Sequence, residues 1–207
     1  KRFLEYSLKF ENHSTISCHQ TPRNVFYIKE ILDNFPNAKI INMVRDPRDI
    51  LLSQKNKWKR RYLGDSSIPF RENIRSYFNY HPITISKIWN SCIQNYYRFK
   101  SNDRVETIKF EDLISNSEKE IQKLCDFLGI DFSEKMLKVP NVDSSTSVDE
   151  KTTLVFDNSK IGKWKLGGIS KSEIYLCQKI CKDNMESFQY KKRNFKCIPL
   201  FAIFQFF

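Results

Sequence analysis

The chain of 207 residues carries 35 Lys and Arg against 24 Asp and Glu, a formal net charge of +11, and 40% of it is hydrophobic. This composition excludes a disordered polar chain. The length suffices for one domain with a sizeable hydrophobic core, and no repeat or low-complexity tract indicates a second domain. The positive charge favours phosphorylated or polyanionic partners, with nucleic acid as the obvious alternative. Lys and Arg are spread along the chain without a recognisable DNA- or RNA-binding motif, so no nucleic acid partner is expected.

A helix is expected to begin at Thr21-Pro22 and to end at Pro36-Asn37. Proline suits the first turn of a helix and stops a helix at its other end. The apolar residues between these limits recur with helical spacing, at Val25, Ile28, Leu32 and Phe35.

The next segment, KIINMVRDPRDILLS, predicts a strand that turns directly into a helix. Lys39 to Val44 has the length and β-branched content of a buried strand, Asp46 suits the N-cap, and Pro47 suits the first helical position. Free N–H groups and the helix dipole make such a turn ready to hold an anion. Arg45 supplies a planar cation, and Ser53 returns to the same face roughly 10 Å further along, so both are expected to grip one phosphate. A solvated helix start with local charge pairing remains the alternative.

Four further elements are expected before residue 130. A surface loop covers Tyr62 to Asn73, a core-facing helix covers Ile85 to Phe99, and a second strand covers Arg104 to Phe110. Ser117 and Glu120 resemble a capping box at the start of a helix that ends at Gly129.

The rest of the chain is expected to form a long loop over Lys138 to Ser159 and then one helix. That helix is capped by Ser170 with Glu173 and runs to about Phe188. The residues from 195 to 207 form an apolar tail too short to cross a bilayer.

Strands alternating with helices predict an α/β fold with a short central parallel sheet flanked by helices. Ligands of such sheets bind beyond the carboxyl ends of the strands. Arg45 and the corner Phe110-Glu111-Asp112 both lie at such ends.

The six cysteines form no C-x-x-C pair and no Cys/His group with metal spacing, so no metal site is expected. Cys125, Cys177 and Cys181 fall on apolar helix faces, which predicts buried free thiols and a reducing, cytoplasmic location. No secretory signal or membrane span is visible in the sequence.

The Arg45–Ser53 segment resembles the 3′-phosphate element of sulfotransferases that use 3′-phosphoadenosine 5′-phosphosulfate. Three other segments resemble the same family in the same order, and together the matches span 21–190 of a domain expected at 1–194. They are Gln20-Thr21-Pro22-Arg23, the strand VETIKFEDL at 105–113 with Phe127-Leu128-Gly129-Ile130 after it, and Lys160-Ile161-Gly162-Lys163-Trp164. The resemblance implies a three-layer fold like that of phosphate-loop nucleoside triphosphatases, and sulfuryl transfer to a hydroxyl or amine acceptor.

The resemblance also implies roles for individual residues. Arg45 and Ser53 would bind the 3′-phosphate, Phe110 would stand beside the nucleotide, and Lys163 would reach phosphate with Trp164 beside adenine. Loop anchoring is an equal alternative for the tryptophan. His19 and Glu111 are the candidates for a catalytic base, although a solvent-exposed histidine and a carboxylate that orients its neighbours are the commoner roles. The acceptor is left open among carbohydrate, peptide and small molecule, and so is the oligomeric state.

Three departures from the family pattern concern turnover. The five glycines begin at Gly64, so no glycine-rich phosphate loop precedes Thr21, and we expect a chain that is truncated at its N-terminus and of uncertain activity. Gln20 stands where a lysine is common, and Phe110 where a tyrosine is common. The alternatives are a basic module for nucleic acid or polyanions, through the cluster KNKWKRR at 55–61, and a kinase-like phosphate-loop protein.

Overall fold

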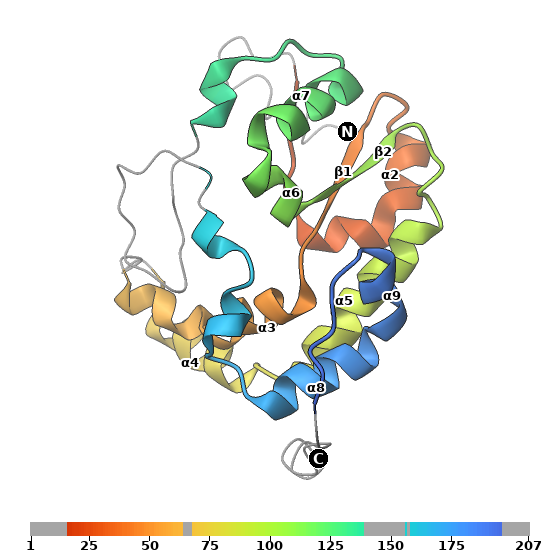
Figure 1. The fold of residues 1–207 in the computed structure, drawn as a ribbon. Coiled ribbons are helices and arrows are strands. Elements are labelled where there is room, and N and C mark those ends of the chain that lie inside the picture. The colour runs from red at the N-terminus through yellow and green to blue at the C-terminus, as the bar shows by residue number, and fades with distance from the viewer. Residues whose placement is uncertain (1–15, 64–67, 139–155, 157, 196–207) are drawn as a thin grey trace.

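The computed structural model describes residues 16–63, 68–138, 156 and 158–195, which contain two strands and helices around them (Figure 1). The elements follow in the order η1 (Pro22–Tyr27), α2 (Ile28–Asn34), β1 (Ile40–Val44), α3 (Pro47–Lys55), η2 (Lys57–Tyr62), α4 (Phe70–Phe78), α5 (Pro82–Tyr97), β2 (Val105–Lys109), α6 (Phe110–Ser115), α7 (Ser117–Leu128), η3 (Glu134–Leu137), η4 (Asn158–Lys160), η5 (Lys163–Leu166), α8 (Lys171–Ile180) and α9 (Lys182–Ser187), where η marks a 3₁₀-helix.

The two strands form a parallel sheet, as the sequence predicts. Ile40 on β1 lies opposite Val105 on β2, and Val44 lies opposite Lys109. Because the strands run in the same direction, both carboxyl ends lie at one edge of the sheet. Both predicted strands are therefore confirmed to within one residue at each end, and so is their parallel pairing.

Helices cover both faces of this sheet, so the predicted α/β arrangement of helix, sheet and helix is present. Val105 packs against Ile28 and Leu32 of α2 in one core cluster. The next residue, Glu106, points to the opposite face. There it pairs with Lys123 of α7 at 2.8 Å. Figure 1 shows α2 on one side of the strands and α6 with α7 on the other.

A larger core joins α3 to the helices that follow it in the chain. Leu51 of α3 is buried with Trp89 of α5, Ile174 of α8 and Met185 of α9. Figure 1 shows α8, one of the helices that supply this core, below α3 and beyond the carboxyl end of β1. This core therefore fixes the turn between β1 and α3, where the candidate site lies.

Four predictions about local structure differ from what the structure shows. The predicted loop over Tyr62 to Asn73 becomes helix α4 from Phe70 onward. The predicted capping box is wrong, because α6 ends only two residues earlier and Ser117 is already helical, with Asn116 at the N-cap. The expected first helix is a 3₁₀ turn followed by α2, and the last one divides into α8 and α9 at Cys181.

Other local predictions are confirmed. Ser170 and Glu173 form a capping box, and Gly129 ends α7 with φ of 74°. Cys125, Cys177 and Cys181 are buried free thiols, whereas Cys18 is exposed. Most of the predicted loop over Lys138 to Ser159, and the tail after Phe195, lie outside the described residues.

No helix in the described ranges is both long and apolar enough to cross a membrane.

Candidate functional site

The turn from β1 into α3 has the capped geometry that the sequence predicts. The side chain of Asp46 accepts a hydrogen bond of 2.9 Å from the backbone N–H of Arg48, and Pro47 occupies the first helical position. Pro47 has no backbone N–H, and the N–H groups of Asp46 and Arg48 on either side of it are held by the carboxylates of Glu111 and Asp46. The prediction that free N–H groups of this turn hold an anion is therefore wrong for these positions.

Arg45 occupies the last position before this turn and is half-buried. Its Nη2 donates to the carbonyl of Lys160 at 2.8 Å, and its guanidinium lies 4.3 Å from the centre of the Phe110 ring. Its Nε is buried and has no hydrogen-bond partner in the described part of the chain. The backbone carbonyl of Arg45 is held by the indole N–H of Trp89 at 3.1 Å. The structure therefore brings Arg45 and Phe110 together and leaves one Arg45 donor without an acceptor.

Ser53 lies in the last turns of α3 and is half-buried. It follows Pro47 by six residues, a rise of roughly 9 Å along the helix axis. Its joint hold on one phosphate with Arg45 stays a prediction.

Glu111 connects the turn to the C-terminal part of the molecule. One carboxylate oxygen accepts the backbone N–H of Asp46 at 2.9 Å, and the other accepts the hydroxyl of Tyr190 at 2.9 Å. Burial, together with the charge of Glu111 and this hydrogen bond, raises the pKa of Tyr190. Because both oxygens of Glu111 hold protein groups, the geometry suits a residue that positions the turn, and its role as a base stays a prediction.

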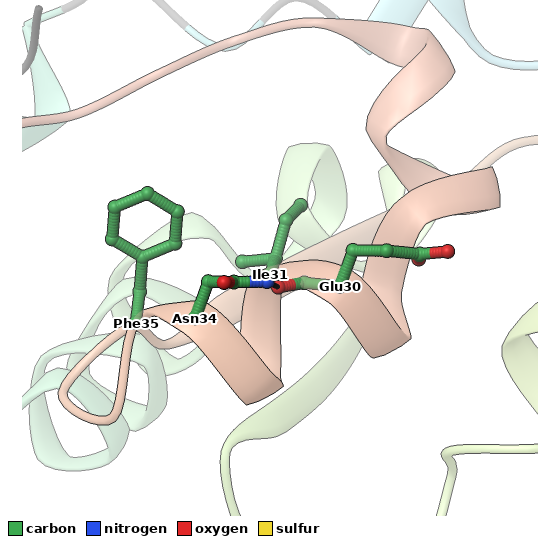
Figure 2. Close-up of a pocket in the computed structure, with 4 residues that line it drawn as sticks. All are labelled: Glu30, Ile31, Asn34 and Phe35. Atoms are coloured by element: carbon green, nitrogen blue, oxygen red, sulfur yellow. Dashed lines mark hydrogen bonds between the residues drawn. The ribbon is translucent and has the colours of Figure 1, made fainter.

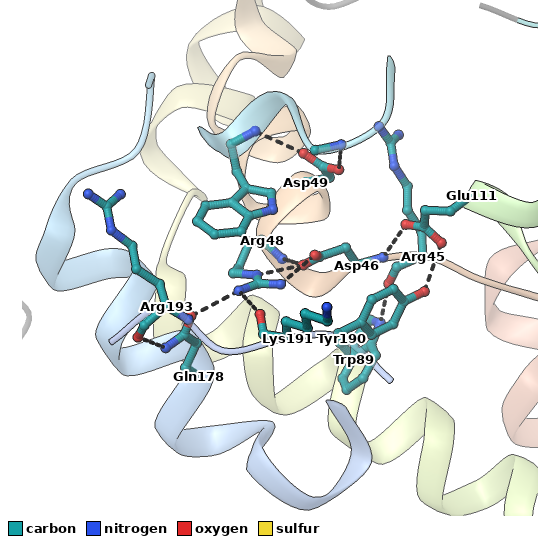
Figure 3. A network of polar contacts seen from close by, with 12 residues as sticks. Arg45, Asp46, Arg48, Asp49, Trp89, Glu111, Gln178, Tyr190, Lys191 and Arg193 are labelled. Atoms are coloured by element: carbon teal, nitrogen blue, oxygen red, sulfur yellow. Dashed lines mark hydrogen bonds and ion pairs between the residues drawn. The ribbon is translucent and has the colours of Figure 1, made fainter. Parts of the chain in front are cut away.

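Arg48 is the buried partner of the N-cap. It donates to both oxygens of Asp46, at 2.9 and 2.6 Å, and its guanidinium lies 3.9 Å from the centre of the Trp164 ring. It also donates to Gln178 at 2.9 Å and to the carbonyl of Lys191 at 2.8 Å (Figure 3). Four of the five N–H groups of Arg48 are thus bonded to protein acceptors, whereas the Arg45 side chain extends away from this buried pair.

Asp49 holds the basic loop that the resemblance placed over the nucleotide. Its two oxygens accept the backbone N–H groups of Gly162 at 2.8 Å and Trp164 at 3.0 Å (Figure 3). Burial raises the pKa of Asp49, although these two N–H groups and the charge of Arg45 act against the rise. Lys163 lies between the two bonded residues and is half-buried. The first turn of α3 therefore fixes the backbone of this loop.

The remaining predicted site residues have different surroundings. Trp164 is 5% exposed, belongs to the large core and packs against Arg48, so in this structure it anchors the loop. Its contact with adenine stays a prediction. His19 is exposed, in the segment before η1.

Sequence reasoning missed several residues that build the site. Trp89 was visible only as one member of an apolar helical stripe, and Asp49 only as a charge in the R-D-P-R-D string. Tyr190 and the carbonyl of Lys160 gave no signal, because one polar contact between distant segments leaves no periodic pattern.

The pocket beside α2 lies apart from the candidate site. This pocket of about 390 Å³ is lined by Glu30, Ile31, Asn34 and Phe35, none of which is a predicted site residue (Figure 2). Within the ranges that the structure covers, no three His, Cys, Asp or Glu side chains are grouped so that they could hold a metal ion.

Comparison with known proteins finds similarity to sulfotransferases. The model of the sulfotransferase family matches residues 1–134. Carbohydrate sulfotransferase 3 of Tetronarce californica is 24% identical over 191 residues, which is 82% of this chain and 40% of that protein. The chain thus spans about two fifths of the length of this curated relative.

Two solved structures are similar to this chain. The sulfotransferase domain from the curacin biosynthetic pathway has a TM-score of 0.48 and 22% identity, over 84% of this chain and 60% of that one. Mouse sulfotransferase SULT7A1, complexed with PAP, has a TM-score of 0.46 and 17% identity, over 74% of this chain and 60% of that one. The family match covers more than half of the present sequence, including β1, α3 and β2. The chain belongs to the sulfotransferase family.

Proposed function

We propose that this chain takes part in the transfer of a sulfuryl group from 3′-phosphoadenosine 5′-phosphosulfate to a hydroxyl or amine acceptor. In this reaction the acceptor oxygen or nitrogen forms a bond to sulfur, and the bond from sulfur to the 5′-phosphate oxygen breaks. The acceptor proton passes to a base, and 3′,5′-adenosine bisphosphate leaves. The part of this reaction that the described residues support is recognition of the 3′-phosphate.

The surroundings of Arg45 are the observation that carries the proposal. It is a permanently charged fork at the carboxyl edge of a parallel sheet, immediately before a capped helix. Its Nε has no partner in the part of the chain that the structure covers. An anion at this place would meet the Arg45 guanidinium, which is permanently charged and suited to phosphate.

The basic loop of residues 160–166 supports the same proposal. The Asp49 carboxylate accepts two backbone N–H groups of this loop, and the Lys160 carbonyl accepts a hydrogen bond from Arg45. Lys163 lies between the two residues whose backbone Asp49 holds, and as a second cation beside the phosphate it would strengthen binding of a doubly charged group.

The class of the sulfuryl acceptor is proposed from a relative and not from contacts in the structure. The name of the Tetronarce californica relative states a carbohydrate acceptor for that protein. We adopt a carbohydrate as the first acceptor to test, with peptide and small hydroxylated molecules after it. The buried thiols of Cys125, Cys177 and Cys181 support, as a proposal, a reducing location such as the cytoplasm.

Calorimetric titration tests the role of Arg45 most directly, with 3′,5′-adenosine bisphosphate and 5′-adenosine monophosphate as a matched pair of ligands. The wild-type chain should bind the bisphosphate more tightly, because only this ligand carries the 3′-phosphate. Arg45→Ala should weaken binding of the bisphosphate by about ten- to a hundredfold, the value of a hydrogen bond to a charged group. It should leave binding of the monophosphate nearly unchanged.

Two further variants complete this experiment. Ser53→Ala should give a smaller loss of the same kind, because a neutral hydroxyl contributes less than a guanidinium. Arg75→Ala removes an exposed arginine from α4 and should bind both ligands like the wild type. If Arg45→Ala keeps the preference for the bisphosphate, Arg45 does not bind the 3′-phosphate.

A further inference from the structure

The apolar side of helix α4 faces outward instead of packing into the core. Phe70, Ile74, Tyr77 and Phe78 share one side of this helix by their spacing, and they are 57%, 43%, 58% and 77% exposed. Asn73 is the one residue of α4 that is buried. A cluster of exposed apolar side chains on one helix face marks an interaction surface rather than a core element.

The neighbouring 3₁₀-helix η2 extends this surface with further rings. Trp58 makes edge-on contacts with Tyr62, at 6.2 Å between ring centres, and with Tyr77 of α4, at 5.8 Å. Tyr62 is 63% exposed. Figure 1 shows α4 at the periphery of the molecule, away from the two strands. We call these six residues the η2–α4 surface: Trp58, Tyr62, Phe70, Ile74, Tyr77 and Phe78.

Cations border this surface, and acidic groups there are scarce. Lys57 and Lys59 on η2 and Arg71 on α4 are exposed. Glu72 is the one acidic residue in the two helices, and Arg75 pairs with it at 3.2 Å. The border therefore carries a net positive charge, and a partner that covers the rings must be anionic.

We propose that the η2–α4 surface docks on an anionic phospholipid membrane. Phe70, Ile74 and Phe78 have no polar side-chain atom, so they gain nothing from the hydroxyl groups of a sugar, whereas the acyl region below lipid headgroups takes up such side chains favourably. Tyr and Trp rings suit the headgroup level, and the bordering cations meet anionic headgroups. A second copy of the chain would place like charges against each other.

Sedimentation with lipid vesicles tests this proposal on the whole 207-residue chain. The chain should bind vesicles of phosphatidylcholine with phosphatidylserine, bind pure phosphatidylcholine much more weakly, and be released as the salt concentration rises. The double variant Phe70→Ser/Phe78→Ser should bind at least about tenfold more weakly, because two large apolar side chains are lost. The triple variant Lys57→Gln/Lys59→Gln/Arg71→Gln should bind about a hundredfold more weakly, at roughly fivefold for each cation.

A matched control keeps the test specific to this surface. Phe26→Ser/Ile88→Ser removes two apolar side chains that are 45% and 53% exposed on η1 and α5, and it should bind vesicles like the wild type. All these variants retain the apolar residues after Phe195, so vesicle binding that is insensitive to the changes on η2 and α4 overturns the proposal. The thermal unfolding midpoint of each variant shows whether it has folded.

Two other results would also overturn the proposal. Salt-sensitive retention on heparin without any vesicle binding would indicate an acidic glycan as the partner. A concentration-dependent dimer that the double phenylalanine variant abolishes, again without vesicle binding, would indicate a second copy of the chain. Neither result would alter the assignment of Arg45, which the nucleotide titration tests separately.

Discussion

Two arginines three residues apart have opposite surroundings. Arg48 is 2% exposed, four of its five N–H groups donate to protein acceptors, and Trp164 covers one face of its guanidinium. Arg45 is half-buried and rests on Phe110, and its Nε has no hydrogen-bond partner among the described residues. We therefore assign stability to Arg48 and ligand binding to Arg45, although both belong to the same R-D-P-R-D string.

This difference predicts the effect of removing Arg48. Arg48→Met should lower the free energy of unfolding by about 3–5 kcal/mol, because it leaves the Asp46 carboxylate buried without its cation. Urea unfolding measures the loss, and Arg45→Ala is the matched control that should lose much less. A loss below about 1 kcal/mol, the range of an exposed ion pair, would contradict the buried role of Arg48.

Asp49 gives a second prediction at this scale. In Asp49→Asn the side chain keeps one oxygen, which can accept one of the two backbone N–H groups. The new amide NH₂ group is a hydrogen-bond donor, and it would face the other N–H donor without an acceptor between them. The amides of Gly162 and Trp164 should exchange hydrogen faster, and binding of 3′,5′-adenosine bisphosphate should weaken by about tenfold, the value of one such bond. Hydrogen exchange and calorimetry measure the two effects, with the exposed Asp183→Asn as control. Faster exchange with unchanged nucleotide affinity would separate the loop from the binding site.

At the scale of elements, one carboxylate joins three parts of the helical core. Glu173 of α8 accepts from Lys55 of α3 at 2.8 Å, from the hydroxyl of Tyr80 at 2.5 Å and from the backbone N–H of Ser170 at 2.5 Å. Burial acts to raise the pKa of Glu173, but these three bonds outweigh it, so its pKa lies below the ordinary value of 4.5. The ionised form of Glu173 is therefore favoured in the folded chain.

The lowered pKa predicts how stability depends on pH. Glu173 contributes stability that is fully present above pH 4.5 and is lost as the pH falls through its lowered pKa in the folded chain. Glu173→Gln should lower the free energy of unfolding by about 1–3 kcal/mol at neutral pH and flatten its decline in acid. Urea unfolding at a series of pH values measures both effects. An unchanged acid decline would show that Glu173 does not titrate differently in the folded chain.

Helix α4 and the division at Cys181 show which elements the sequence could not predict. The Gly, Asp, Ser and Pro residues before Phe70 dominate the composition there and concealed the apolar face of a short helix. The apolar stripe predicted for one helix comprises Ile174, Cys177, Cys181, Met185 and Phe188. The first four are buried and Phe188 is half-buried, yet the stripe continues through the break between α8 and α9. Apolar spacing reports which side is buried, and it does not report whether the backbone hydrogen bonds are continuous.

For the whole molecule, the sheet edge was predictable and the contacts that complete the site were not. The rule for parallel strands brings Arg45 and Phe110 to one edge once both strands are recognised. The bonds from Arg45 to Lys160 and from Gly162 to Asp49 join residues 115 and 113 positions apart. Side-chain bonds to a distant backbone carry no periodicity or composition, so only the resemblance of the 160–164 segment to a family motif placed that loop near the nucleotide.

The contact between Glu111 and Tyr190 carries the last prediction, because it ties the sheet edge to the C-terminal part of the chain across 79 positions. Glu111→Gln and Tyr190→Phe should be coupled by about 0.5–3 kcal/mol in a double-mutant cycle of unfolding free energies. Burial and the Glu111 charge raise the pKa of Tyr190 above 10.0, so the stability that its neutral phenol provides is present below pH 10.0 and declines as the pH rises above that value. Tyr190→Phe should reduce this alkaline decline, the remainder coming from Tyr80, whose pKa burial also raises, whereas Tyr27→Phe, an exposed tyrosine, should leave the decline unchanged. Additive effects in the cycle, together with an unchanged alkaline limb, would show that the two parts of the molecule are held together by other contacts.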